Sequence, residues 1–307
     1  MQAIGWRAAG RALALALAVW TTGALSGPAI AQDWDAVEIE TLPVAGSVHM
    51  LTGRGGNLAV STGADGIFLV DDQFAPLTPK IQAALRELQE GPIRFVLNTH
   101  WHGDHTGGNE NLGRSGSVIV AHREVRKRMS AAQVQALRGR TVPASPADAL
   151  PIVTFSEDLR FHLNGEEIHV VHVPAAHTDG DAIVHFLGSN VIHVGDVFFN
   201  GFYPYIDLDS GGSVAGMLAA QDVALALAGP ETKLVPGHGP LGGKAELQAA
   251  RDMLASARDR VAAAVEAGDS LDALRTRAPL ADLEARWGDG FMSSDQFLAI
   301  VHTDLTR

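Results

Sequence analysis

The sequence has 307 residues, of which 46% are hydrophobic and 19% charged, and its formal net charge at pH 7 is −12. This length and composition are typical of a compact α/β enzyme and exclude a disordered or coiled-coil chain. The acidic balance argues against nucleic acid and anionic membranes as partners. Because the chain has no cysteine, its stability depends on the core and on any bound metal rather than on disulfides.

Residues 1–31 are typical of a secretory signal peptide. Arg7 and Arg11 precede an Ala/Leu/Val run at 12–19, and small residues stand at 29–31, where a signal peptidase would cut. The apolar run is short for a membrane anchor, which needs about 20 residues. We expect cleavage after residue 31 and a periplasmic or secreted protein. Its mature net charge is −14, because the two arginines leave with the peptide.

The first half of the mature chain predicts strands with one early helix. Two strands are expected within 37–51, separated by a break at 43–46, and further strands at 58–61 and 67–70. A helix is expected at 76–90, with an apolar face at Leu77, Ile81, Leu85 and Leu88. The apolar run at 93–98 predicts a buried strand.

The rest of the chain continues the alternation of strands and helices. A strand is expected at 118–121, a charged helix at 124–138, a proline-containing connection at 139–151 and strands within 153–173 around an Asn164-Gly165 turn. Later helices are expected at 214–227, 246–266 and 292–304. This order predicts an α/β fold with one domain over 32–307, whose C-terminal helices begin at about residue 240.

Three imidazoles and a carboxylate lie within six positions directly after the strand predicted at 93–98: His100, His102, Asp104 and His105. Strand ends are where α/β folds place ligand sites, and zinc binds imidazole and carboxylate where no thiolate is available. Because adjacent side chains point in different directions, we expect His100 and His102 at one metal and the other two at a second. The alternative is a polar loop of hydrogen-bonded histidines.

Three more potential ligands follow predicted strands in the second half. They are His177, Asp196 and His238, and glycine stands beside each of the last two, which lets the backbone approach a crowded site. The sequence resembles the metallo-β-lactamase superfamily over about residues 47–240. The resemblance lies in the motif His-X-His-X-Asp-His at 100–105, followed by His177, a Gly-Asp at 195–196 and a Gly-His-Gly at 237–239. The resemblance implies an αββα sandwich, in which two β-sheets face each other and helices cover the outside.

The resemblance also implies a dinuclear site. It assigns one metal to His100, His102 and His177, a second to Asp104, His105 and His238, and the bridging position to Asp196. Two Zn²⁺ are expected, and iron or manganese also suits these ligands. Such a pair, about 3.5–4 Å apart, yields a metal-bound hydroxide at neutral pH. Asp104 is the expected catalytic residue, because it could orient the water and pass on its proton.

This site implies hydrolysis of a cyclic or activated acyl bond. His102 argues against di-iron redox relatives, which usually carry an acidic residue there. Asp196 is usual in thioesterases, lactonases and phosphodiesterases of the superfamily, whereas its exported β-lactamases usually carry Cys or Ser. Export favours a β-lactam as the substrate, with a lactone or thioester as the alternative. From another class, the chain could be an exported metal-binding accessory protein of a cofactor or electron-transfer pathway.

Four further residues are candidates around the ligands: Asp71, Asn57, Tyr203 and Tyr205. Asp71 ends a predicted strand and could accept a hydrogen bond from a ligand imidazole. Asn57 belongs to a glycine-rich turn that could form one wall. Either tyrosine could donate to an oxyanion, or could simply pack against the sandwich. Asp207, Asp209 and the stretch 210–213 are expected to cap the helix at 214–227 rather than to touch substrate. The oligomeric state stays open.

Overall fold

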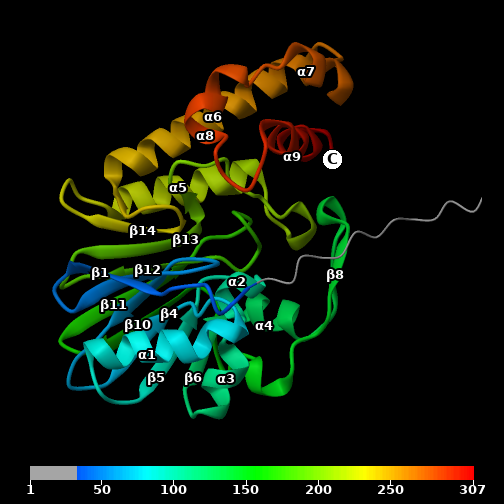
Figure 1. Ribbon diagram of the computed structural model, residues 1–307. Coiled ribbons are helices and arrows are strands. Elements are labelled where there is room, and N and C mark those ends of the chain that lie inside the picture. The colour runs from blue at the N-terminus through cyan, green and yellow to red at the C-terminus, as the bar shows by residue number, and fades with distance from the viewer. Residues whose placement is uncertain (1–32) are drawn as a thin grey trace, which may run out of the picture. The chain divides into compact units, whose positions relative to one another are not determined.

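Two β-sheets lie face to face at the centre of the structure, a computed structural model that describes residues 33–307 (Figure 1). The predicted signal peptide lies outside the described residues. Residues 34–307 form one unit with dense internal contacts. No helix within 33–307 is long and apolar enough to cross a membrane.

The first sheet has seven strands. In spatial order they are β1 (Glu40–Ala45), β2 (Val48–Thr52), β3 (Leu58–Ser61), β4 (Ile67–Val70), β5 (Ile93–Asn98), β6 (Val118–His122) and β9 (Val153–Phe155). The pairs from β1 to β4 are antiparallel, and those from β4 to β9 are parallel. The carboxyl ends of β4, β5 and β6 therefore meet at one edge of the sheet.

The second sheet has six strands. They are β10 (Asp158–Leu163), β11 (Glu166–His172), β12 (Ala182–Phe186), β13 (Val191–Phe199), β14 (Lys233–His238) and β15 (Gly242–Gly243). The predicted turn between β10 and β11 is confirmed: Asn164 and Gly165 have φ of 55° and 75°, as a two-residue hairpin requires. β13 and β14 are parallel, so their carboxyl ends also lie at one edge.

Helices cover the outer face of each sheet (Figure 1). Below the first sheet lie α1 (Thr78–Leu88), α2 (Gly103–Thr106), α3 (Asn109–Arg114) and α4 (Arg123–Met129). Above the second lie α5 (Val214–Leu227), α6 (Lys244–Glu266), α7 (Leu271–Arg277), α8 (Glu284–Trp287) and α9 (Ser294–Thr306). The expected αββα sandwich is confirmed.

Three apolar clusters hold these layers together. One lies between the sheets and joins Phe68 and Val48 of the first to Ile168 and Val184 of the second. A second packs the predicted apolar face of α1 on the outside of the first sheet. The third joins β13 to α5, α6 and α9. Burial of this apolar area from both sides of both sheets is what stabilises the four layers.

Two expectations about local structure are wrong. The predicted helix at 124–138 ends at Met129, and Gln133–Gln135 (β7) pairs instead with Arg140–Val142 (β8) in a separate hairpin. The residues after Met129 do not continue an apolar helix face. The side chain of Gln135 instead donates to Asp207, and this contact favours the hairpin. The predicted break at 43–46 begins too early, since Pro43 lies within β1. β1 is an edge strand, where a missing backbone N–H is tolerated.

Candidate metal centre

The carboxyl ends of strands from both sheets bring the predicted ligands together. Thr99 and the histidine cluster follow β5, and His177 lies in the loop between β11 and β12. His238 is the last residue of β14. Asp196 was expected after a strand, but β13 continues past it to Phe199. A bulge at Gly195, with φ of 55°, shifts the register and turns the carboxylate toward the cluster.

The first group consists of His100, His102, His177 and Asp196, all buried, with one potential ligand atom of each within 4.8 Å of the others. His102 Nδ1 lies 2.8 Å from His177 Nε2. Asp196 Oδ2 lies 3.4 Å from His177 Nε2 and 3.7 Å from His100 Nε2. Three imidazole nitrogens and one carboxylate oxygen thus converge on one point.

The second group consists of Asp104, His105 and His238. Asp104 Oδ2 and His105 Nε2 each lie 3.4 Å from His238 Nε2. The second oxygen of Asp196, Oδ1, lies 3.2 Å from His105 Nε2 and 3.5 Å from His238 Nε2. Asp196 therefore presents one oxygen to each group, which is the arrangement of a bridging ligand.

Two atoms of the cluster lack hydrogen-bond partners in the part of the chain that the structure describes. His100 Nε2 and Asp196 Oδ1 are both buried and make no hydrogen bond. Burying a polar atom unpaired costs about 1–3 kcal/mol, and more for a charged one. A divalent cation in each group would satisfy both atoms. The residues present thus fit two metal ions, and a donor set of imidazole and carboxylate suits zinc, iron or manganese.

The protonation of the cluster agrees with this fit. Burial lowers the pKa of His100, His102 and His177, which keeps these imidazoles in the neutral form that binds metals. Burial also lowers the pKa of His238, but the carboxylates of Asp196 and Asp104 outweigh it and raise that pKa to about 9. The same two carboxylates would attract a divalent cation to the second group.

Hydrogen bonds fix the orientation of three ligand imidazoles. His105 Nδ1 lies 2.7 Å from Asp71 Oδ2, and His177 Nδ1 lies 2.7 Å from the carbonyl oxygen of Tyr205. His100 Nδ1 lies 3.1 Å from Thr99 Oγ1, whose hydroxyl donates to Asp71. Such partners hold the rings and set their tautomers. Asp71 thus lies in the position expected of it, in contact with a candidate ligand.

Asp207 was missed by the sequence reasoning. It does accept from Ser210 N, but it caps a short 3-10 turn, whereas Ser213 of the same predicted capping stretch does cap α5. Its Oδ2 lies 2.8 Å from His102 Nε2, and Gln135 Nε2 donates to the same oxygen over 3.0 Å. All three side chains are buried. No local pattern links residues so far apart in the sequence, so only the fold could show this contact.

Asn57 and the tyrosines differ in their distance from the centre. Asn57 Nδ2 donates to the carbonyl oxygens of Pro236 and Gly239 over 3.0 and 2.8 Å, which holds the backbone around His238. The ring of Tyr205 lies 5.9 Å from that of His102. The ring of Tyr203 instead stacks on Phe297 of α9 in the helical core, so the structure places it in packing rather than at the ligands.

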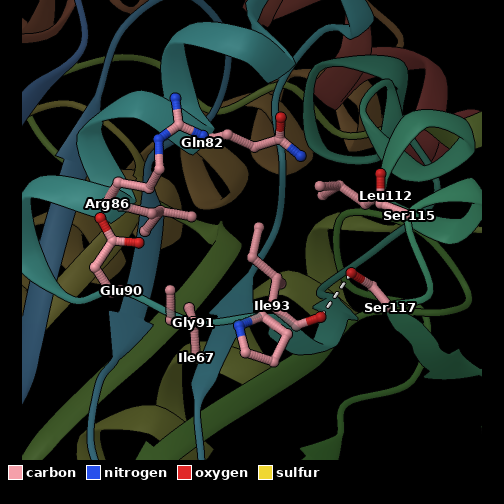
Figure 2. Close-up of a pocket in the computed structure, with 11 residues that line it drawn as sticks. Ile67, Gln82, Arg86, Glu90, Gly91, Ile93, Leu112, Ser115 and Ser117 are labelled. Carbon is pink, nitrogen blue, oxygen red and sulfur yellow. Dashed lines mark hydrogen bonds between the residues drawn. The ribbon is translucent and has the colours of Figure 1, made fainter.

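Two pockets lie near the cluster, and the larger one includes a residue of the cluster in its lining. One, of about 520 Å³, lies beside His238 and is lined by Thr52, Asn57, Phe202 and Phe291, among others. The other, of about 170 Å³, is lined by Tyr205, Phe291 and Arg138. A third pocket, of about 210 Å³, is shown in Figure 2. It lies at the amino ends of β4 and β5, away from the edge where such folds bind ligands.

Comparison with known proteins identifies the family. A model described as the metallo-beta-lactamase superfamily matches residues 43–238. The chain is 24% identical over 184 residues to the 2,4-dinitroanisole O-demethylase subunit alpha of Nocardioides sp. (strain JS1661), covering 58% of this chain and 51% of that protein. It is 28% identical over 144 residues to a hydroxyacylglutathione hydrolase of Gloeobacter violaceus, covering 44% and 49%. The chain thus spans about half the length of these curated relatives.

Solved structures show the same fold. A metallo-beta-lactamase from Pontibacter korlensis matches with a TM-score of 0.58 at 18% identity, over 71% of this chain and 99% of that one. The DIM-1 metallo-beta-lactamase matches with the same TM-score and identity, over 72% and 99%. The family match covers all seven clustered residues, from His100 to His238. The chain belongs to the metallo-beta-lactamase superfamily.

Proposed function

We propose that this chain is a dinuclear zinc hydrolase that opens a cyclic or activated acyl bond. The observation that carries the proposal is Asp196, with Oδ2 facing the first group of ligands and Oδ1 facing the second. A carboxylate in this position holds two cations close together. When bound, such a pair supplies a water of lowered pKa and polarises the acyl carbonyl.

Asp104 is the residue best placed to handle the proton of the attacking water. Its side chain is 29% exposed, whereas that of Asp196 is 5% exposed, so Asp104 faces the open side of the cluster. Burial raises the pKa of Asp104, but His105 and His238 outweigh that effect and keep the carboxyl ionised. An ionised carboxylate at the mouth of the site can accept the proton of a water and later give it to the leaving group.

A β-lactam is the first substrate that we propose, because the predicted signal peptide would carry the protein to the compartment that such compounds reach first. A thioester is the second candidate, and a lactone belongs to the same chemistry. The thioester is favoured by the carboxylate at Asp196, and among the curated relatives are hydroxyacylglutathione hydrolases. All three substrates present an acyl carbon that a hydroxide can attack and a leaving group that Asp104 could protonate.

The test uses the protein from Gln32 onward, with metal content measured on the same sample. We expect two zinc ions per chain and turnover of a chromogenic cephalosporin that is lost on chelation and restored by zinc. Turnover of an acyl-glutathione but not of the cephalosporin would favour the second candidate. Two metals per chain without hydrolysis of cephalosporin, thioester or lactone would refute the proposal and favour a metal-binding accessory protein.

We also propose that the protein is exported and cleaved after Ala31, and that it acts on a small molecule rather than on nucleic acid or membranes. The support is the charge and order of residues 1–31 and the net charge of the mature chain. The mass of the protein recovered from a periplasmic extract tests it. A mass that corresponds to a chain beginning at Gln32 is expected, and an uncleaved chain in the cytoplasm would contradict export.

A further inference from the structure

We propose that Arg138 and the hydroxyl of Tyr205 form a subsite for a carboxylate on the substrate. This inference rests on the proposed hydrolase function and narrows it to acyl substrates that carry a negative charge beside an apolar group. Arg138 lies between β7 and β8, in the hairpin that the sequence did not predict. Its guanidinium lies 4.3 Å from the centre of the Tyr205 ring.

Arg138 is an unpaired cation at the edge of the site. It forms no ion pair or hydrogen bond with any residue in the described range 33–307, whereas its charged neighbours are engaged. Arg140 Nε donates to Gln135, and Arg275 pairs with Asp295 over 2.7 Å. A guanidinium keeps five N–H donors in a plane that matches a carboxylate, so this one is available for an anionic ligand.

Tyr205 supplies a second, independent sign of a missing ligand. Its side chain is 4% exposed, and its hydroxyl has no hydrogen-bond partner in the described part of the chain. A buried hydroxyl without a partner is uncommon, because it loses hydrogen bonds to water without replacement. Tyr205 and Arg138 line the same pocket of about 170 Å³. A carboxylate bound there would accept from both donors.

The subsite lies close enough to the metal centre to belong to one substrate. The Tyr205 ring is 5.9 Å from His102 and 5.7 Å from His177, both in the first group. Phe291 lines this pocket and also the larger one beside His238, and its ring lies 5.8 Å from that of His238. This phenylalanine is 52% exposed, so it offers an apolar surface between the two pockets.

The substrate that fits has three parts in sequence. Its acyl carbon faces the cluster, an apolar portion rests on Phe291, and a carboxylate reaches Arg138 and Tyr205. Phe291 and the α9 residues of the pocket follow the segment that the family model matches, 43–238, and the arginine stands on a hairpin apart from both sheets. Arg138 and Tyr205 lie within that segment, so the subsite combines residues of the family segment with residues that follow it.

The test compares a chromogenic cephalosporin as the free acid and as its methyl ester, on the metal-loaded protein. We expect Arg138→Ala to raise KM for the acid about 10-fold or more, with kcat nearly unchanged and KM for the ester changed less than twofold. Arg138→Lys should recover part of the loss, because it keeps the charge but not the planar fork. Tyr205→Phe, which keeps the backbone contact to His177, should raise KM for the acid several-fold.

Arg86→Ala is the matched control, since it removes an exposed arginine of the pocket in Figure 2 and should change neither substrate. Equal effects of Arg138→Ala on acid and ester would overturn the inference. If the wild-type protein hydrolyses neither compound, the β-lactam proposal fails, and calorimetry with the intact acid and the intact ester decides the subsite. Preferential binding of the acid that disappears in Arg138→Ala would support it; equal binding of both would refute it.

Discussion

Replacing Asp207 with Asn should weaken the first metal site selectively. Asp207 Oδ2 lies 2.8 Å from His102 Nε2, and this contact leaves Nδ1 as the atom that faces His177 and the metal. A hydrogen bond to a charged group contributes about 1.5–3 kcal/mol, and a neutral one about 0.5–1.5 kcal/mol. The asparagine amide can still accept a hydrogen bond from His102, so the variant loses only the difference between a charged and a neutral hydrogen bond. We expect this difference to be about 1.4 kcal/mol, which corresponds to a tenfold weaker metal affinity at the first site.

Asp207→Ala should cost more than the amide, because it removes the shared acceptor altogether. Ser210 Oγ and Gln135 Nε2 also donate to Asp207 Oδ2, over 2.8 and 3.0 Å, and both would lose their partner. We expect the loss of affinity at the first site to approach 100-fold, the upper end for such positions. The ring of His102 would then be free to turn.

The assay is zinc competition with a chromophoric chelator, which resolves the two affinities. Asp71→Asn is the matched control, since Asp71 contacts His105 of the second group over 2.7 Å. It should weaken the second site more than the first, because Asp71 reaches His100 of the first group only through Thr99. Equal weakening of both sites by Asp207→Asn, or wild-type affinity at both, would refute the assignment of Asp207 to His102.

Three further outcomes follow from the same geometry. Asp196→Ala should lower metal content below that of the wild type and remove most activity; retention of both metals would disprove its bridging role. Gly237→Ala should also release metal, because a Cβ there would lie 2.0 Å from Asp196 Oδ1, whereas Gly229→Ala, with its nearest contact at 3.6 Å, should not. Burial, aided by stacked His172, lowers the pKa of His122 to about 4, so the neutral ring is favoured in the fold. The free energy of unfolding should therefore fall as the pH is lowered from 6.5 to 4. In urea titrations His122→Asn should reduce that fall by up to about 3 kcal/mol. The same dependence of the unfolding free energy on pH in variant and wild type would refute this role of His122.

The sequence predicts the layers and the cluster because both depend on local signals. Strand periodicity, the Asn164-Gly165 turn and histidines placed directly after a strand are each readable within a few residues. What it does not predict depends on contacts across the fold. Gln135 lies in a stretch whose charges suggest a helix, yet it ends in a hairpin, since its amide meets a carboxylate 72 residues away. Tyr203 and Tyr205 look equivalent by position, and only packing separates them.

The β7–β8 hairpin links the metal centre to the proposed carboxylate subsite. Gln135, at one end of the turn, is buried and donates to Asp207, the partner of His102. Arg138 lies three residues further on and covers Tyr205. The same hydrogen bonds that orient a metal ligand therefore fix where the guanidinium can reach. Because the hairpin pairs with neither large sheet, its residues other than Gln135 can change without disturbing the strands that carry the ligands. We infer that this chain sets its substrate preference there, while the two sheets keep the metal centre constant.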